Sequence, residues 1–441
     1  MKPQLLIGAM SPGSGKTLFT TGLSRLLKRK GQQVQNFKCG SDFVDAKLLE
    51  LASNNPCLHI DLFVASSSHV QHLYNKYGER ADVCLIEGQG GLFDGYDRKN
   101  GSSAQIAELM KAPVLLVVNA RSSSYSISAS IYGFKHYHPT ARIIGVVFTQ
   151  VVSSEQYLFL RKASQDAGVN CFGYIPYDER LKLPSKHACH TNAVIQEMDG
   201  IFDLSASFIE KYVDIDHLFS SCQRSFPVPY TLPYKEETDT ISYYSPKKHL
   251  RIAVADDPAF GLTYPENLNR FSQIGEICRF SPIYGNDIPQ ADIIYLPGGY
   301  PEMFARQLYR RKKMLEDLKN YAEAGGRILA EDGGMVLLSQ SLCVREGGTA
   351  YPMAGVLPLE FALTDKKIQS GYRQIHDRNT MLRGYEYHYT SVRSNLGITP
   401  TAQVVNPFGN EVDTPFVRYK NVIASFSHLY LGETDIQKLW D

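Results

Sequence analysis

A glycine-rich turn near the start of the chain constrains the fold more than any other segment. An apolar stretch suited to a strand, Gln4–Ala9, leads into Ser11-Pro-Gly-Ser-Gly-Lys-Thr17, and a helix-like stretch continues to Lys30. A strand, a glycine-rich turn and a helix in this order place backbone N–H groups and the positive end of the helix around an anion. The segment therefore predicts a phosphate-binding loop in an α/β domain.

The residue types in this turn indicate a nucleotide. Lys16 would reach the β- and γ-phosphates, and the Thr17 hydroxyl would bind Mg²⁺. Met10 stands where the strict Walker spacing requires glycine, so the turn is a variant of that motif. The alternative is a glycine-rich turn with a surface lysine. We predict ATP as the ligand, bound by Gly13, Ser14, Gly15, Lys16 and Thr17.

Short apolar stretches alternate with helix-like stretches along the first 220 residues. Beyond the first strand, the candidate strands are Gln33–Phe37, Val83–Glu87, Val114–Val118 and Ile143–Phe148, and Ser103–Met110 is a candidate helix. This rhythm predicts a mostly parallel sheet with helices on both faces. The rhythm is lost in a proline-containing stretch, residues 221–248, which we interpret as a linker.

A second α/β pattern begins after the linker. Its candidate strands are 251–255, Ile293–Leu296, Arg327–Ala330 and Val422–Phe426. We therefore predict two α/β domains, residues 1–220 and residues 249–441.

The composition limits the classes of partner. The 441 residues carry a formal net charge of +1, which gives no electrostatic reason to expect nucleic acid or an anionic membrane. The eight cysteines are scattered without a CxxC pair, which argues for a reducing compartment and against a zinc ribbon or a disulfide framework. No apolar run reaches the roughly 18 residues of a membrane span, and no signal peptide precedes the first strand. We expect a cytoplasmic enzyme.

Two further segments add charged side chains to the predicted phosphate site. Glu87 ends an apolar strand and is followed by a glycine-rich loop, and a glutamate at this position can hold Mg²⁺ directly or through water. Lys38, Asp42 and Asp45 follow the second candidate strand. The lysine would neutralise a phosphoryl group in transfer, and a carboxylate could share the metal. We predict Thr17, Asp42 and Glu87 as metal ligands of a ligase that forms an acyl phosphate.

A sharp turn at Asp332 is the most informative feature of the C-terminal half. The apolar run Ile328–Ala330 ends there, a glycine pair follows, and Met335–Leu338 resumes an apolar pattern that could start a helix. A strand, sharp turn and helix of this kind expose a nucleophile beside free backbone N–H groups. A carboxylate, however, is a far poorer nucleophile than a thiolate towards an unactivated amide.

Three segments resemble the cobyrinic acid a,c-diamide synthase family: KCGSDFVD at 38–45, EGQGGLFDG at 87–95 and GGYPE at 298–302. Similar pieces continue to Ala424-Ser-Phe-Ser-His-Leu429, so the resemblance runs nearly end to end. It implies a dethiobiotin synthetase-like P-loop domain and a flavodoxin-like domain of the class I glutamine amidotransferase type. It also implies ATP- and Mg²⁺-dependent amidation of acetate side chains of a corrin-type tetrapyrrole through an acyl phosphate.

The resemblance implies roles for residues of both domains. Lys38, Asp42, Asp45 and Asp94 would lie near the acyl phosphate, Gly298 and Gly299 match the oxyanion-hole turn, His428 matches the catalytic histidine, and Asp332 replaces the nucleophilic cysteine. We therefore predict an inactive glutaminase. The nitrogen would come from free ammonia or from a separate glutaminase.

Other working positions also depart from the family pattern. They are Ser41 for proline, Leu49 for histidine, Gln89-Gly90 for Val-Met, Thr149-Gln150 for an Asn-Arg pair near the nucleotide base, Tyr385 for histidine, and the segment 186–190. Within that segment His187, Cys189 and His190 fit an ordinary loop better than a zinc site. His388 alternates with tyrosines as in a strand, where it is either a buried, hydrogen-bonded histidine or a substrate contact.

Three hypotheses about function follow. The first is a cobyrinate a,c-diamide synthase-like ligase that uses ammonia, and the second is a ligase for another tetrapyrrole or polycarboxylate. The third is a nucleotide-dependent protein that binds a tetrapyrrole or a partner protein without catalysis. The charged set of Lys38, Asp42 and Asp45 weighs against the third, and the resemblance makes a homodimer plausible.

Overall fold

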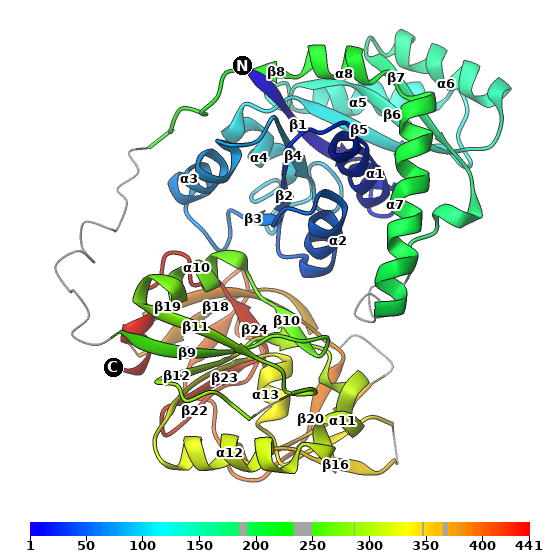
Figure 1. Ribbon diagram of the computed structural model, residues 1–441. Coiled ribbons are helices and arrows are strands. Elements are labelled where there is room, and N and C mark those ends of the chain that lie inside the picture. The colour runs from blue at the N-terminus through cyan, green and yellow to red at the C-terminus, as the bar shows by residue number, and fades with distance from the viewer. Residues whose placement is uncertain (185–191, 233–248, 286, 346–347, 365–368, 379) are drawn as a thin grey trace. The chain divides into compact units, whose positions relative to one another are not determined.

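The computed structural model describes residues 1–184, 192–232, 249–285, 287–345, 348–364, 369–378 and 380–441. The chain divides into two compact units, Met1–Lys235 and Glu236–Asp441 (Figure 1). Both units have an α/β fold. The division falls within the stretch that we expected to be a linker, of which residues 233–248 lie outside the described residues, as do 186–190 with His187, Cys189 and His190.

The N-terminal unit is built around one sheet with the strand order β3-β2-β4-β1-β5-β6-β7. All neighbours in this order are parallel, and β8 pairs antiparallel with β1. The predicted parallel sheet is confirmed, with strand ends shifted by up to a few residues. The strands are β1 Lys2–Ala9, β2 Val34–Cys39, β3 Leu58–Ile60, β4 Val83–Glu87, β5 Val114–Asn119, β6 Ile143–Val151, β7 Asn170–Pro176 and β8 Gln223–Arg224.

Helices cover both faces of this sheet. Right-handed crossovers place helices on one face when the chain moves from β1 towards β3, and on the other face when it moves from β3 towards β7. On the first face α1 packs against α2 and α7, and on the second α3 packs against α4 and α5 against α6. The helices are α1 Lys16–Arg29, α2 Phe43–Ser53, α3 Ser67–Gly78, α4 Ser103–Met110, α5 Ile127–Tyr137, α6 Ser154–Asp166, α7 Asn192–Tyr212 and α8 Ile215–Ser221, with a 3-10 turn η1 at Glu179–Leu181.

The central strand β1 explains why the first apolar run of the sequence is continuous. Leu5, Leu6 and Ile7 are fully buried, because helices cover the strand on both sides. Leu5 and Ile7 face the same core as Phe19 and Leu23 of α1. This packing fixes the direction in which α1 leaves the glycine-rich turn, and so it positions the phosphate site.

Residues 222–232 belong to the N-terminal unit, although we expected them to be linker. The carbonyl of Cys222 accepts a bond from the amide of Gln4 at 3.0 Å. The Asn75 side chain donates to the carbonyl of Val228 and accepts from its amide, both at 2.8 Å. Gln71 donates to the carbonyl of Pro229 at 3.0 Å. The amide side chains of α3 thus replace the strand partners that a proline-rich segment lacks.

The two bonds between Asn75 and Val228 lead to a prediction about stability. Asn75→Ala leaves a buried N–H and a buried C=O of Val228 without partners, so we expect a loss of about 1–3 kcal/mol in the free energy of unfolding. Lys76→Ala, at the next and exposed position of the same helix, is the matched control and should change it by less than about 0.5 kcal/mol. Urea unfolding followed by circular dichroism measures both, and equal effects would contradict this role for Asn75.

The C-terminal unit has a six-stranded sheet with the order β11-β9-β12-β14-β23-β22. Its first five strands are parallel and follow the flavodoxin-like order 2-1-3-4-5, and β22 adds an antiparallel edge. The flavodoxin-like fold that the resemblance implied is therefore confirmed. The strands are β9 Leu250–Ala255, β11 Gly275–Phe280, β12 Ile293–Leu296, β14 Arg327–Glu331, β22 Phe416–Tyr419 and β23 Val422–Ser425.

A large set of further strands, most of them between β14 and β23 in the chain, was mostly not revealed by the sequence pattern. They form two four-stranded sheets, β16-β15-β17-β20 and β21-β18-β19-β24, in which all pairs are antiparallel except β15 with β17. The strand β24 follows β23, and β10 pairs with β13 ahead of β14. These strands are β10 Phe260–Leu262, β13 Gly298–Gly299, β15 Ser341–Cys343, β16 Ala350–Pro352, β17 Leu359–Leu363, β18 Gln369–Asp377, β19 Thr380–His388, β20 Thr390–Asn395, β21 Gln403–Val405 and β24 Ser427–Leu429. The helices of the unit are α10 Pro265–Ile274, α11 Ala305–Arg310, α12 Lys312–Glu323 and α13 Gly333–Leu337, with 3-10 turns η3 Pro301–Phe304 and η4 Ile436–Trp440. Within the described part of the chain, no helix combines the length and the apolarity needed to cross a membrane.

Candidate functional site

The glycine-rich turn connects β1 to α1, as the sequence predicted. Gly13 and Gly15 have φ angles of 75° and 90°, which glycine tolerates and which let successive N–H groups turn inward. Nothing lies within 4 Å of the place where a Cβ of Gly13 would stand, so the turn is open there. Lys16 Nζ donates to the carbonyl of Gly90 at 2.6 Å. Burial lowers the pKa of Lys16, and phosphate oxygens would be a stronger partner than this neutral carbonyl.

Thr149 on β6, which is separated from β1 by β5, holds the turn. Its hydroxyl donates to the carbonyl of Ser14 at 2.8 Å. Its methyl carbon would lie 3.3 Å from a Cβ at Gly15, so a larger residue at 15 would press against β6. Thr149 therefore supports the backbone of the turn, a role that the sequence analysis did not anticipate.

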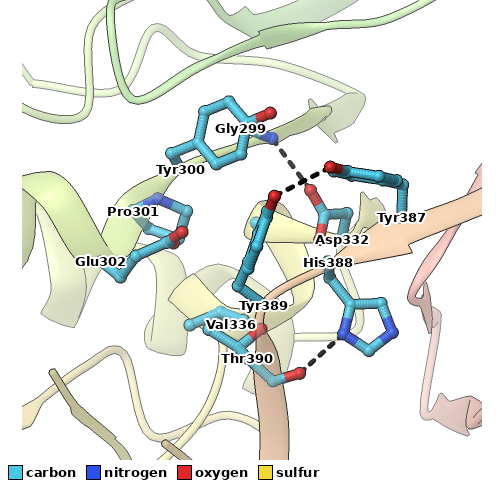
Figure 2. A pocket seen from close by; sticks show the side chains of 11 residues that line it. Gly299, Tyr300, Pro301, Glu302, Asp332, Val336, Tyr387, His388, Tyr389 and Thr390 are labelled. Carbon is cyan, nitrogen blue, oxygen red and sulfur yellow. Dashed lines mark hydrogen bonds between the residues drawn. The ribbon is translucent and has the colours of Figure 1, made fainter. Parts of the chain in front are cut away.

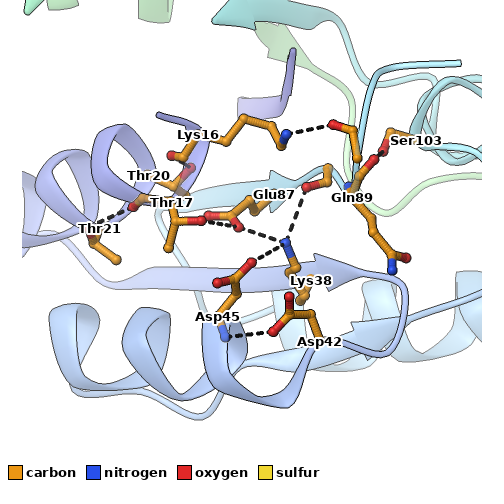
Figure 3. A network of polar contacts seen from close by, with 12 residues as sticks. Lys16, Thr17, Thr20, Thr21, Lys38, Asp42, Asp45, Glu87, Gln89 and Ser103 are labelled. Carbon is orange, nitrogen blue, oxygen red and sulfur yellow. Dashed lines mark hydrogen bonds and ion pairs between the residues drawn. The ribbon is translucent and has the colours of Figure 1, made fainter. Parts of the chain in front are cut away.

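A buried lysine on β2 connects the turn to carboxylates on α2 and β4. Lys38 Nζ lies 2.7 Å from Glu87 Oε1 and 3.1 Å from Asp45 Oδ2, and Thr17 donates to the same Glu87 oxygen at 3.0 Å (Figure 3). Lys38 is 2% exposed. Although burial opposes the charged form, the carboxylates of Glu87 and Asp45 raise the pKa of Lys38 well above its usual value. The structure thus brings together Thr17, Lys38, Asp45 and Glu87, whose catalytic and metal-binding roles stay predictions.

The surroundings of Glu87 fit a bound Mg²⁺ ion. Glu87 is fully buried, and its Oε2 has no hydrogen-bond partner among the described residues. An orphaned carboxylate oxygen beside the Thr17 hydroxyl is the kind of oxygen donor that Mg²⁺ takes, together with phosphate oxygens and water. Mg²⁺ would therefore be held by Glu87 and Thr17. Asp42 begins α2 and accepts a bond from the amide of Asp45 at 3.1 Å, so part of its acceptor capacity caps the helix.

Asp94 and Gln89 shape the loop that follows β4. Asp94 accepts from the amide of Gly91 at 2.7 Å, which closes the loop on itself. The Gln89 side chain lies against Gly40, and a Cβ at position 40 would stand 1.5 Å from Gln89 Oε1. Only glycine therefore fits at position 40 while Gln89 has this conformation. The loops after β2 and β4 are therefore in direct contact beside the buried lysine.

The predicted strand, sharp turn and helix around Asp332 form a second site, in the C-terminal unit. Asp332 lies between β14 and α13 with φ 43° and ψ −108°, a conformation that is strained for any residue except glycine. A Cβ at Gly334 would stand 2.2 Å from the carbonyl oxygen of Leu296, and one at Gly298 would stand 2.0 Å from His428 Cε1. These glycines are needed because backbone and side chains approach each other so closely here.

The Asp332 carboxylate binds the turn that the resemblance assigned to the oxyanion hole, Gly298 and Gly299. Its Oδ2 accepts from the Gly299 amide at 3.2 Å (Figure 2). The same oxygen lies 3.6 Å from Nε2 of His428. The amide that would bind the oxygen of a tetrahedral intermediate is therefore already paired with a protein oxygen. Burial lowers the pKa of His428 to about 4, so this histidine is neutral at physiological pH.

His388 forms one wall of the same pocket and carries a positive charge. Its Nδ1 lies 2.6 Å from the carbonyl oxygen of Thr390, and its Nε2 lies 2.7 Å from Glu386 Oε1. Both partners are acceptors, so both ring nitrogens must donate, and the ring is an imidazolium. Burial opposes this charge, but the bond to Glu386 and the nearby Asp332 raise the pKa of His388. His388 is therefore the buried, hydrogen-bonded histidine of the first interpretation. It also lines the pocket, and a contact with substrate stays a prediction.

The remaining walls of this pocket are residues that the sequence analysis did not single out. The hydroxyl groups of Tyr387 and Tyr389 are hydrogen-bonded to each other, with their oxygens 2.8 Å apart. Tyr300 and Glu302 line the same pocket and face them (Figure 2). Burial raises the pKa of Glu302 to about 8. Behind His388, Glu386 is bound by Arg373 at 2.6 Å. The period of two along β19 could have indicated that Glu386 and His388 share a face.

Comparisons with known proteins identify the family of each unit. Residues 5–190 match the family described as CobQ/CobB/MinD/ParA nucleotide binding domain, and residues 251–436 match the CobB/CobQ-like glutamine amidotransferase domain. The chain is 32% identical to the cobyrinate a,c-diamide synthase of Dehalococcoides mccartyi, over 98% of this chain and 95% of that relative. The chain belongs to the cobyrinate a,c-diamide synthase family.

Two other relatives span similar lengths. The hydrogenobyrinate a,c-diamide synthase of Pseudomonas aeruginosa is 32% identical, over 97% of this chain and 94% of the relative. The cobyrinate a,c-diamide synthase of Saccharolobus solfataricus is 29% identical, over 98% of this chain and 99% of the relative. Membership of the cobyrinate a,c-diamide synthase family confirms the resemblance drawn from the three segments.

Asp332 leads to a prediction about pH. Burial raises its pKa to about 7, whereas an aspartate in an unfolded chain has a pKa of about 4. The folded state binds this proton more tightly, so its contribution to stability is complete below about pH 4 and is lost as the pH rises towards 7. Asp332→Asn keeps an acceptor for the Gly299 amide without the charge. Its stability relative to the unaltered chain should rise by about 2–3 kcal/mol between pH 5 and pH 8.

Urea unfolding of both chains at the two pH values measures this difference. Glu316→Gln, which changes an exposed carboxyl of α12, should show no such pH-dependent gain. A constant difference between Asp332→Asn and the unaltered chain would mean that Asp332 is ionised throughout.

Proposed function

We propose that the protein catalyses ATP-dependent amidation of carboxylate side chains of a cobyrinate-type tetrapyrrole, with ammonia as the nitrogen donor. One observation carries this proposal: the buried lysine network of the phosphate site is complete, whereas a carboxylate fills the oxyanion hole of the glutaminase site. Family membership supplies the substrate class, because the relatives are named for diamide synthesis on cobyrinate or hydrogenobyrinate. The contrast between an intact phosphate site and an altered glutaminase site comes from this chain's own residues.

The first chemical step is phosphoryl transfer at the edge formed by β1, β2 and β4. An oxygen of the substrate carboxylate forms a bond to the γ-phosphorus of ATP, the bond to the bridging oxygen breaks, and ADP leaves. Lys16 and Lys38 neutralise charge on the phosphoryl oxygens, and Glu87 and Asp45 keep Lys38 protonated and oriented. Mg²⁺, when bound, supplies further charge neutralisation at the phosphates.

The second step is attack of ammonia on the carbonyl carbon of the acyl phosphate. The new C–N bond forms, the nitrogen loses a proton, and the C–O bond to phosphate breaks. Inorganic phosphate and the amide are the products. This step needs neutral ammonia and a phosphate leaving group, and neither requires a cysteine thioester.

Ammonia is favoured as the donor because glutamine hydrolysis lacks both of its main requirements. Asp332 supplies no thiolate, and its Oδ2 holds the Gly299 amide at 3.2 Å. The neutral His428 would have no thiol to activate. A separate glutaminase subunit would supply the same ammonia to the same acyl phosphate.

The donor is tested with purified full-length protein, ATP, Mg²⁺ and cobyrinic acid, by following product mass and ADP release. We expect amide with ammonium chloride and none with glutamine. Equal product from glutamine would contradict the proposal. If the protein binds the tetrapyrrole in a nucleotide-dependent way and forms no amide from either donor, the noncatalytic alternative is favoured.

The same assay tests the buried lysine. Lys38→Met keeps the volume but removes the charge that balances Glu87 and Asp45, so we expect kcat to fall by roughly 100-fold or more. Lys47→Met on α2 removes an exposed lysine that pairs with Glu50 at the surface, and it should leave kcat within about twofold. ATP binding by Lys38→Met, measured by calorimetry, separates a catalytic loss from misfolding. A kcat within tenfold of the unaltered chain would remove Lys38 from the mechanism.

A further inference from the structure

A cavity of about 340 Å³ lies in the C-terminal unit and shares only His388 with the pocket around Asp332. It forms where two sheets diverge, because β19 ends at His388 in one four-stranded sheet and β20 begins at Thr390 in the other. Protein interiors hold few voids larger than a water molecule, and small-molecule sites begin at about 300 Å³. The cavity is therefore large enough for a small organic ligand.

The inner walls of the cavity are apolar. Leu359 of β17, Val417 of β22 and Phe426 line it, and each is at most 2% exposed. The Phe426 ring stacks on the His388 ring, with centroids 3.9 Å apart and planes 12° from parallel. An apolar ligand body would bind favourably against these side chains, because its surface leaves water.

Glu386 places a buried carboxylate in the lining. Its Oε2 accepts from Arg373 Nε and from the Thr414 hydroxyl, both at 2.6 Å, and its Oε1 accepts from His388 at 2.7 Å. Although burial opposes the charged form, the bonds from His388 and Thr414 lower the pKa of Glu386. An ionised carboxylate has about four lone-pair positions, so the described residues leave one of them, on Oε1, for a ligand. The three bonds also fix the carboxylate, which reduces the entropy lost on binding.

The polar groups of the lining favour a ligand that donates hydrogen bonds. His388 gives one ring proton to the Thr390 carbonyl (Figure 2) and the other to Glu386, so no proton is left for a ligand. Asp413 is exposed at the mouth of the cavity and adds a second carboxylate. No lysine or arginine is among the described residues that line the cavity. Two carboxylates and one imidazolium give the lining a net charge that a cation complements.

We propose that this cavity binds a small organic ammonium ion, which is a protonated primary amine on an apolar body. The ammonium group donates to Glu386 Oε1, and the apolar body packs against Leu359, Val417 and Phe426. The inference does not depend on the proposed function, since neither ATP nor a tetrapyrrole enters it.

The test compares phenethylamine, phenethyl alcohol and hydrocinnamate, which share an aromatic body and end in a cation, a neutral hydroxyl and an anion. Calorimetry with the full-length protein at pH 7, without ATP, measures the affinity of each. We expect the amine to bind with a Kd of about 0.1–1 mM. The alcohol should bind about tenfold more weakly, because a charge-assisted hydrogen bond is lost, and hydrocinnamate should not bind.

Three variants locate the binding site. Val392→Trp places an indole at the mouth, since Val392 lines the cavity and is 39% exposed, and it should weaken amine binding about tenfold or more. Leu396→Trp is the matched control, because Leu396 is 58% exposed and is not a lining residue, and it should leave the affinity within about twofold. Glu386→Gln keeps the shape of the side chain without its charge, and it should abolish the preference for the amine over the alcohol.

Four outcomes would overturn the proposal. They are no binding of any probe at millimolar concentration, amine affinity in Val392→Trp within twofold of the unaltered chain, equal affinities for the amine and the alcohol, and tighter binding of hydrocinnamate than of the amine. If circular dichroism shows that Glu386→Gln does not fold, the two tryptophan variants and the three probes still decide.

Discussion

The buried contact between Lys38 and Glu87 is the interaction on which the phosphate site depends. Taking two charges out of water costs several kcal/mol each, and only close pairing with further hydrogen bonds offsets that cost. Here Lys38 lies 2.7 Å from Glu87 and 3.1 Å from Asp45, and Thr17 donates to the same glutamate. The network joins the ends of β1, β2 and β4, so the turn, the charge and the carboxylates are positioned by one set of contacts.

The C-terminal site differs from the phosphate site, because its charged side chains pair with one another, whereas the phosphate site keeps charged groups for a ligand. Arg373 and His388 are positive, Glu386 and the ionised Asp332 are negative, and the first three form a chain of contacts of 2.6 and 2.7 Å. The Asp332 carboxylate also satisfies the Gly299 amide. A thiolate in place of Asp332 would leave that amide available to an oxyanion. In the proposed function, one aspartate side chain therefore both lacks a thiol nucleophile and holds the amide that an oxyanion would need.

The sequence predicted the parts of the fold that local pattern controls. Most strands of both parallel sheets, the turn at Gly13–Thr17 and the elbow at Asp332 follow from apolar runs and glycines, because these signals lie within a few residues of each other. The strands β3, β7 and β11 were not predicted. The strands from β15 to β21 were largely missed. Four of them, β15, β16, β17 and β21, are three to five residues long, and pairs such as β17 with β20 and β18 with β21 connect residues that are distant in the chain. The segment 222–232 was taken for linker because its partners, Asn75 and Gln71, lie on a helix far away in the sequence.

The sequence by itself determined the chemistry of both sites: a lysine and carboxylates beside a phosphate turn, and an aspartate where a thiol nucleophile would be required. Only the tertiary structure decided what those groups contact. It placed the Asp332 oxygen on the Gly299 amide, gave both nitrogens of His388 acceptors, and left Glu87 Oε2 without a partner among the described residues. The physical reason is that residue type fixes which bonds a side chain can form, whereas the packing of distant strands fixes its position, its burial and therefore its charge.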